Sequence, residues 1–295
     1  MPLRPIPELI AHAEQNGYAL GYFESWNLES LQGVLDAAEA TRSPILLGFN
    51  GEFLSRPGRK LPERLRCYAA MGKAAVDSAS VPCALVFNEC SRDNWTRDAI
   101  LAGFNLVMPA DPAAPFQEFI GRVKALADFA HQRRVAIESE LGELPFGGSG
   151  KVTGGSDLTD PEMAARFVQE TGIDLIAVSV GNVHVLIEGQ RDLDLDQLCR
   201  IRVLVRKPLV LHGGTGISSG SLQEAIRMGV AKVNYGTYLK QAYLRAIRLI
   251  PIENSDPHEL LGLGSEHDVM MAGRIAVRDA VLERIGLLGC CGKAD

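Results

Sequence analysis

Eight short apolar segments, each followed by a longer segment with the spacing of an amphipathic helix, constrain the fold of this chain more than any other feature. The apolar segments predict strands at residues 19–23, 44–49, 81–87, 106–108, 135–140, 175–180, 208–211 and 232–235. The amphipathic segments predict helices at residues 28–41, 63–78, 93–102, 116–133, 161–171, 195–205, 218–228, 238–249 and 267–285. Regular alternation of strand and helix is typical of α/β proteins with a parallel sheet.

The predicted strands are apolar along their whole length, which indicates strands that are buried on both faces. Eight such strand–helix units favour a closed (β/α)8 barrel, and a doubly wound open sheet is the alternative. No linker, charge block or low-complexity tract divides the 295 residues, and barrels often fill one domain of this size. We therefore expect residues 1–295 to form a single α/β domain, a TIM barrel with extra C-terminal helices.

Charge and cysteine usage exclude several classes of protein. The net charge of −6, from 30 basic and 36 acidic residues, argues against binding to nucleic acid or to an anionic membrane. No run approaches the roughly 18 apolar residues of a membrane span, and the first residues do not resemble a signal peptide. The six cysteines form no Cys-x-x-Cys pair. These features predict a cytoplasmic protein with reduced thiols.

Polar residues gather directly after the predicted strands, where the loops of a barrel carry its chemistry. Glu89, His184 and His212 follow three different strands and would converge on one mouth. Two imidazoles and one carboxylate can hold a divalent cation and leave positions open for a substrate. Glu140 is a candidate for a fourth or alternative ligand. A lone histidine is more often structural, so the prediction of a metal centre depends on the combination.

Glycine-rich turns after the last two strands predict a phosphate site. Glycines let backbone N–H groups approach an anion, and barrels often bind phosphate in these two loops. Lys232 either joins this site or is structural. The residues expected to contact the phosphate or the rest of the substrate are Gly213, Gly214, Thr215, Asn234, Gly236 and Thr237, together with Asn50 after the second strand.

A second glycine-rich segment, at residues 142–155, interrupts the strand–helix pattern. Two interpretations are open: a lid that closes over the barrel mouth, or a flexible surface insertion.

The order and spacing of these motifs resemble the class II, metal-dependent fructose-bisphosphate and tagatose-bisphosphate aldolases. The motifs Leu-His-Gly-Gly-Thr-Gly at 211–216 and Lys-Val-Asn-Tyr-Gly-Thr at 232–237 are specific in combination. The segments that carry the resemblance span nearly the whole chain, at 18–23, 27–44, 81–85, 103–108, 137–142, 167–184, 208–217 and 229–237.

The resemblance implies a (β/α)8 barrel that forms homodimers or homotetramers and binds one divalent metal ion, commonly zinc. It implies reversible cleavage of a phosphorylated ketose to dihydroxyacetone phosphate and an aldehyde, with the metal polarising the ketose carbonyl. By position, His184 and His212 match metal ligands of the family, and Glu140 matches a carboxylate that holds the metal in an alternate position. The residues that match the family's phosphate-binding segments are Gly213, Gly214, Thr215, Asn234 and Thr237.

Several positions depart from the family's pattern, including Asn50, Ala110 and Val185, and three others bear most directly on the chemistry. The family usually has Asp-His at the end of the third strand, where Asn88 and Glu89 stand here. Asn88 has no useful proton, and losing a general acid/base typically costs about 10²- to 10⁴-fold in rate. Glu89 can still bind a metal through oxygen, which makes Mn²⁺ or another hard divalent ion an alternative to zinc. Glu24 stands where the family commonly has Asn, so we expect it either to replace the missing acid/base or only to pair with a basic group.

The sequence therefore predicts a divergent class II aldolase with Asn88 and Glu24 as catalytic positions. A metal-dependent sugar-phosphate isomerase or epimerase is a second interpretation, because it too begins with a polarised carbonyl. A non-catalytic homologue that binds a sugar phosphate is a third, and Asn88 supports it most directly.

Overall fold

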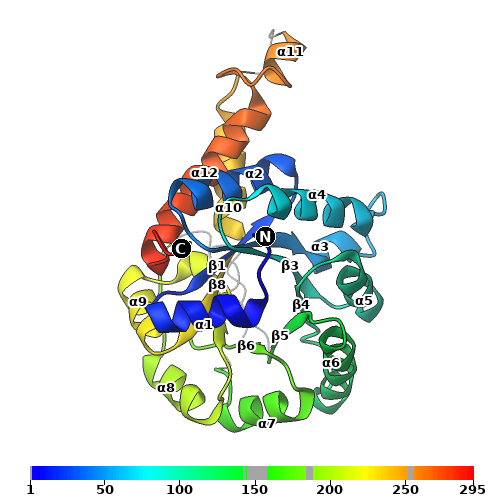
Figure 1. Cartoon of the computed structure of the whole chain (residues 1–295), viewed down its shortest axis with the longest axis vertical. Helices are drawn as coiled ribbons and strands as arrows, with labels where there is room; N and C mark the ends of the chain where they lie inside the picture. Colours follow the sequence, from blue (N-terminus) through cyan, green and yellow to red (C-terminus); the bar gives the residue numbers. More distant parts are fainter. Residues whose placement is uncertain (1, 142–143, 145–157, 184–188, 252–255) are drawn as a thin grey trace.

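A computed structural model describes residues 2–141, 144, 158–183, 189–251 and 256–295 of the chain. Its eight parallel strands pair in sequence order and close into a barrel, β1-β2-β3-β4-β5-β6-β7-β8, with β8 beside β1. Figure 1 shows the helices arranged around this barrel. The predicted (β/α)8 barrel is confirmed, and the open-sheet alternative is wrong. His184 and most of the 142–155 segment lie outside the described residues.

The strands are β1 (Leu20–Ser25), β2 (Ile45–Asn50), β3 (Cys83–Cys90), β4 (Leu106–Pro109), β5 (Ala136–Glu140), β6 (Leu175–Ala177), β7 (Leu209–Leu211) and β8 (Val230–Tyr235). The helices before β5 are α1 (Ile6–Asn16), α2 (Leu28–Ala40), α3 (Gly51–Ser55), α4 (Leu65–Ser78), α5 (Asp93–Ala102) and α6 (Phe116–His131). Those after it are α7 (Pro161–Thr171), α8 (Leu195–Leu204), the 3₁₀ turn η1 (Gly214–Gly216), α9 (Ser219–Arg227), α10 (Thr237–Arg248), α11 (Pro257–Leu260) and α12 (Val269–Leu288).

The strands are buried on both faces, as their apolar sequences predict. Every residue of β1, β2 and β8 is buried, and Phe23 of β1 stacks on Tyr235 of β8 with ring centroids 5.4 Å apart. Because the barrel interior and the helix layer both exclude water, neither face of these strands tolerates the polar alternation of a half-exposed sheet. Polar side chains are thereby confined to the strand ends, apart from a few that are paired inside.

Polar caps fix the starts of several helices close to their predicted positions. Asn27 accepts a hydrogen bond from the backbone N–H of Ser30 and forms a capping box at the start of α2. Asp160 and Asp194 accept backbone N–H bonds in the same way at the starts of α7 and α8. Each such cap satisfies an N–H group that the helix itself leaves without a partner.

Two strand boundaries differ from the prediction in a way that matters for the mouth of the barrel. β3 continues through Cys90, and its pairing with β4 shifts register between Phe87 and Cys90. β6 ends at Ala177 instead of at residue 180, and beyond it the N–H groups of Ser179 and Val180 donate to the side chains of Thr159 and Asn182. The polar helix expected after Pro5 is present as α1, whereas α3, α11 and η1 were not among the predicted elements.

The C-terminal helices pack beside the barrel. Arg274 on α12 makes two hydrogen bonds to the carboxylate of Asp36 on α2, at 2.6 and 2.7 Å. Figure 1 shows α12 continuing beyond the barrel toward α11. In the described part of the chain, no helix combines the length and apolarity needed to cross a membrane.

We predict that Gly48→Ala destabilises the barrel. A Cβ on Gly48 of β2 would lie 1.9 Å from the carbonyl oxygen of Val86 on β3, so the two strands would have to separate. Overpacking of this kind typically costs about 1–3 kcal/mol, measured as the free energy of unfolding in denaturant. Gly121→Ala on α6 is the control, because no atom lies within 4 Å of its added Cβ. The control is expected to stabilise by about 0.5–1 kcal/mol. A Gly48→Ala protein as stable as the wild type would contradict this account.

Candidate active site

A cavity of about 160 Å³ lies at the carboxyl ends of the strands. It is lined by Tyr22, Glu24, Asn50, Phe53, Asn88, Glu89, His212, Gly213, Thr215, Asn234, Tyr235, Gly236, Thr237 and Lys240. Most of the predicted site residues therefore face one space, as convergence of strand ends in a barrel requires. Three predicted residues are not in this lining: Glu140, Gly214, and His184, which is not among the described residues.

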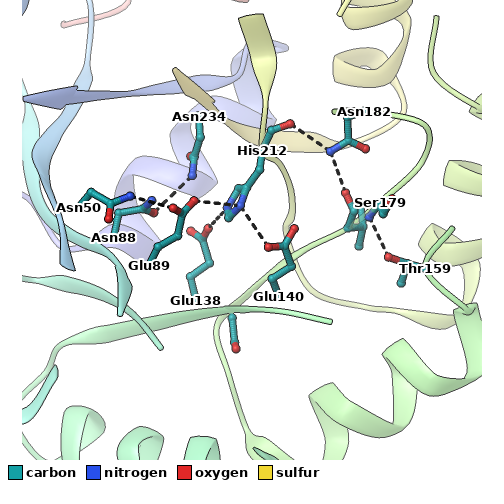
Figure 2. Close-up of polar contacts among 12 residues, drawn as sticks. Asn50, Asn88, Glu89, Glu138, Glu140, Thr159, Ser179, Asn182, His212 and Asn234 are labelled. Atoms are coloured by element: carbon teal, nitrogen blue, oxygen red, sulfur yellow. Dashed lines mark hydrogen bonds and ion pairs between the residues drawn. The ribbon is translucent and has the colours of Figure 1, made fainter. Parts of the chain in front are cut away.

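His212, at the end of β7, is the centre of a buried ionic network (Figure 2). Its Nε2 lies 3.0 Å from Oε1 of Glu138 on β5, and Oε2 of Glu138 lies 2.7 Å from Nζ of Lys232 on β8. The side chains of Glu138 and Lys232 are completely buried, and His212 is 1% exposed. Although burial raises the pKa of Glu138, the adjacent Lys232 and His212 outweigh it and lower that pKa overall. The carboxylate thus stays ionised and fixes the orientation of the imidazole ring.

The other nitrogen of the same ring points toward two further carboxylates. Nδ1 of His212 lies 3.5 Å from Oε1 of Glu89 and 3.5 Å from Oε2 of Glu140. These distances are long for hydrogen bonds, and Nδ1 is a buried atom without a hydrogen-bond partner among the residues that the structure describes. A buried polar atom of this kind indicates that another group belongs beside it.

A bulge in β3 turns the side chain of Glu89 toward Nδ1 of His212. Glu89 has a φ of +47°, in the left-handed region that a non-glycine residue rarely adopts, and it sits where the β3–β4 register shifts. In a regular strand, neighbouring side chains point to opposite faces, so Asn88 and Glu89 would not share one space. The bulge lets both line the cavity. Asn50 holds Glu89 in place by donating a hydrogen bond of 2.8 Å to Oε2.

The electrostatics of this cluster suit a divalent cation. Burial alone lowers the pKa of His212, but Glu140, Glu138 and Glu89 raise it, to about 10 overall. Three carboxylates around one imidazole hold a positive charge at a position where a metal ion can replace the proton. As they stand, the described residues contain no group of three or more His, Cys, Asp or Glu side chains arranged to hold a metal. They provide a partial donor set, to which the predicted ligand His184 would add.

The side chain of Asn182 connects the backbone after β6 to the backbone at the end of β7. Its side-chain amide donates a hydrogen bond of 3.0 Å to the carbonyl oxygen of His212, and its Oδ1 accepts one of 2.8 Å from the N–H of Val180. The ends of β6 and β7 are thereby tied together two residues before the position of His184.

Asn88 is the last member of a hydrogen-bonded chain that starts at Lys232 and passes through Asn234. Nζ of Lys232 donates a hydrogen bond of 2.6 Å to Oδ1 of Asn234, and Nδ2 of Asn234 donates one of 3.3 Å to Oδ1 of Asn88. The side chain of Asn88 is fixed with its amide group at the cavity wall. It can orient a ligand hydroxyl, but it cannot exchange a proton with one.

Glu24 pairs with Lys240 of α10 across the cavity rim, and this pairing is compatible with both expectations from the sequence. Burial raises the pKa of the Glu24 carboxyl, and Lys240 offsets this effect only in part. Glu24 is 6% exposed and contacts the same cavity as Asn88.

The glycine-rich turn after β7 is shaped by close packing. Gly213 has a φ of +65°, and a Cβ on Gly214 would lie 2.7 Å from Cγ1 of Val233. Gly214 is buried outside the cavity lining, whereas Gly213, Thr215 and Thr237 belong to it. Such a turn leaves N–H groups accessible to an anion.

Comparison with known proteins identifies the family. The profile of the class II fructose-bisphosphate aldolases matches residues 5–293. The chain belongs to the class II fructose-bisphosphate aldolase family. It is 34% identical over 287 residues to YdjI of Escherichia coli K12, with 96% of both chains covered. It is 30% identical over 299 aligned positions to the fructose-bisphosphate aldolase of Staphylococcus aureus, with 100% of both chains covered. The crystal structure titled YdjI aldolase matches with a TM-score of 0.83 and 31% identity, over 99% of this chain and 100% of that one.

Membership in the aldolase family confirms the resemblance found in the sequence and identifies the chain as an aldehyde-lyase type of enzyme. Sequence reasoning did not assign a role to Glu138 or settle the role of Lys232, although both carry charge within predicted strands. A lysine flanked by apolar residues in a buried strand is itself a signal, since such a charge requires a partner. In this aldolase, Lys232 is not free to bind phosphate, because it is committed to Glu138 and Asn234.

We predict that Lys232→Met lowers the free energy of unfolding by about 3–5 kcal/mol, because it leaves Glu138 buried without its main partner. The double variant Lys232→Met/Glu138→Gln has no uncompensated charge at this position and is expected to recover most of the loss. Denaturant unfolding of the metal-free proteins measures both values. If the double variant is as unstable as the sum of the two single variants, the ion pair is not the source of the effect.

Proposed function

We propose that this chain is a divergent metal-dependent aldolase that reversibly cleaves a phosphorylated ketose, or a related sugar, to dihydroxyacetone phosphate and an aldehyde. The observation that supports this most directly is the buried Nδ1 of His212, which faces Glu89 and Glu140 while Nε2 is fixed by Glu138. These residues would hold a divalent ion, which would supply a Lewis acid for the ketose carbonyl and for the negative charge left by carbon–carbon cleavage.

Glu89, His184 and His212 are the proposed metal ligands, with Glu140 as a fourth or alternative ligand. Glu138 acts through His212, because its hydrogen bond to Nε2 selects the ring orientation that presents Nδ1. Zinc suits the imidazoles, while the carboxylates also suit manganese or another divalent ion.

The substrate's phosphate is proposed to bind to the turn after β7 and the start of α10. The backbone of Gly213, Gly214 and Gly236 would donate N–H groups, and Thr215, Thr237 and Asn234 would contribute side chains. Asn50 would contact the carbon chain of the substrate. Anchoring the phosphate in this way holds the reacting carbons at a fixed distance from His212.

Glu24 is the proposed replacement for the acid/base that Asn88 lacks. Among the described residues that line the cavity, it is the carboxyl group that does not lie against His212, and burial raises its pKa above the ordinary value of a glutamate. We propose that it exchanges a proton with a hydroxyl of the substrate at the cleaved bond, and that Asn88 orients that hydroxyl.

A non-catalytic protein that binds a sugar phosphate is the second candidate. The hydrogen bond from Asn234 to Asn88 favours it, because these two side chains are amides, which do not exchange protons with a ligand hydroxyl. The resemblance further leads us to propose a cytoplasmic homodimer or homotetramer.

We predict that the purified protein holds about one divalent ion per chain, and that Glu89→Ala weakens metal binding by more than about 100-fold, since loss of even an outer partner of a ligand costs about 10- to 100-fold. Elemental analysis and competition with a chelator measure both quantities. Glu266→Ala is the control, since that side chain is 86% exposed and lies away from the cavity lining. A wild-type protein that takes up neither zinc nor manganese would refute the metal centre.

We predict that Glu24→Gln lowers kcat for cleavage of a phosphorylated ketose by about 10²- to 10⁴-fold, as loss of an acid/base requires. Glu24→Asp keeps the carboxyl group and is expected to restore part of the rate. Steady-state assays of the metal-loaded enzymes on a panel of ketose phosphates test both. Unchanged kcat in Glu24→Gln would remove Glu24 from the chemistry, and the absence of cleavage by the wild type would favour the binding protein.

A further inference from the structure

Lys240 is held at the rim of the cavity by three neighbours. Its ammonium group pairs with Oε1 of Glu24. It also lies 4.2 Å from the ring centroid of Phe53 and 5.8 Å from that of Trp26. An ammonium group within about 6 Å of aromatic faces is attracted to them, so the rings keep the charge at the rim whether or not Glu24 is its partner. Lys240 belongs to the first turn of α10, and its side chain is 33% exposed.

Glu24 occupies the space next to the start of α10. Its Oε2 lies 2.8 Å from the position that a Cβ on Gly236 would take. Gly236 is the N-cap residue of α10, and no side chain caps this helix end. The Glu24 carboxylate is thus an anion built into the chain, beside the segment proposed to bind the ligand's phosphate.

We propose that Glu24 competes with the ligand for Lys240: the ion pair opens when a phosphate monoester binds, and Lys240 moves from the carboxylate to the phosphate. This inference rests on the proposed function, because it requires a phosphorylated ligand. It makes Lys240 a specificity-determining residue and gives Glu24 a second effect, which is to weaken the binding of anions that cannot displace it.

The two partners differ in mobility, which determines which of them moves. The Glu24 side chain is 9% exposed and extends from a barrel strand, whereas Lys240 has a flexible four-carbon stem and is partly in solvent. A phosphate monoester carries about −1.5 to −2 charges at neutral pH, compared with −1 for the carboxylate. The more highly charged partner attracts Lys240 more strongly, so the pair selects for a phosphate over a singly charged group such as a carboxylate.

The test is binding of inorganic phosphate to the full-length, metal-free protein, measured by isothermal titration calorimetry. Glu24→Gln removes the competing charge and keeps the shape of the side chain, so its phosphate affinity is expected to rise about 3- to 10-fold. Lys240→Gln is expected to reduce the affinity by a similar factor. In the double variant, Glu24→Gln is expected to give no further gain, because there is no Lys240 left to release. Acetate, which is singly charged, is expected to bind more weakly than phosphate to the wild type, and Glu24→Gln reduces that difference.

Glu224→Gln provides a matched control, since Glu224 forms an exposed ion pair with Arg227 on α9. Its phosphate affinity is expected to equal that of the wild type, and thermal unfolding followed by circular dichroism verifies that each variant folds. Equal or weaker phosphate binding in Glu24→Gln overturns the inference, and so does a lack of phosphate binding in every variant. Neither result depends on turnover. A protein that shows the predicted order of affinities but cleaves no ketose phosphate keeps the inference and loses the proposed function.

Discussion

The ion pair between Glu138 and Lys232 is the interaction on which the rest of the site depends. Two charges in the middle of a barrel are tolerated only when each satisfies the other, because the cost of removing a charge from water is several kcal/mol. The pair joins β5 to β8, and the second oxygen of Glu138 reaches His212 on β7. Three strands are thereby fixed relative to one another, and the imidazole has a single orientation, with Nδ1 toward the mouth.

That orientation of the imidazole directs Nδ1 toward two further carboxylates. Glu89 and Glu140 lie 3.5 Å from Nδ1, which is long for a hydrogen bond, while Nε2 is bonded to Glu138 on the other side of the ring. The bulge in β3 reinforces this reading. A left-handed backbone at Glu89 is unfavourable for a glutamate, and such conformations persist when the surrounding structure requires them, often at functional sites.

Periodicity revealed the barrel and the strand ends, and therefore which residues meet at the mouth. It could not reveal the direction of Glu89, because alternation along a strand assigns Asn88 and Glu89 to opposite faces until a bulge intervenes. It also left the role of Lys232 open, since the sequence alone does not tell whether a lysine in a strand contacts a phosphate or a buried carboxylate. Lys240 was missed because it lies on a helix, one turn after the last glycine motif, and only the packing of α10 against the rim brings it to Glu24. Patterns that belong to one element were predictable, and contacts between elements that are distant in sequence were not.

Charge explains how the departures from the family's pattern fit together. Asn88 stands for an aspartate and removes one negative charge, whereas Glu89 stands for a histidine and Glu24 for an asparagine, which adds two. These three exchanges alone add one negative charge at the mouth, and negative charge there repels a phosphorylated sugar. Lys240 places a positive charge directly beside the negative charge of Glu24. The pair of Glu24 and Lys240 is neutral when no ligand is bound. In the proposal, a phosphate monoester draws the ammonium group of Lys240 away from the carboxylate because it carries more negative charge. The position of Asn88 thus lacks the family's usual acid/base, while Glu24 and Lys240 form a rim that is proposed to respond to the charge of the ligand.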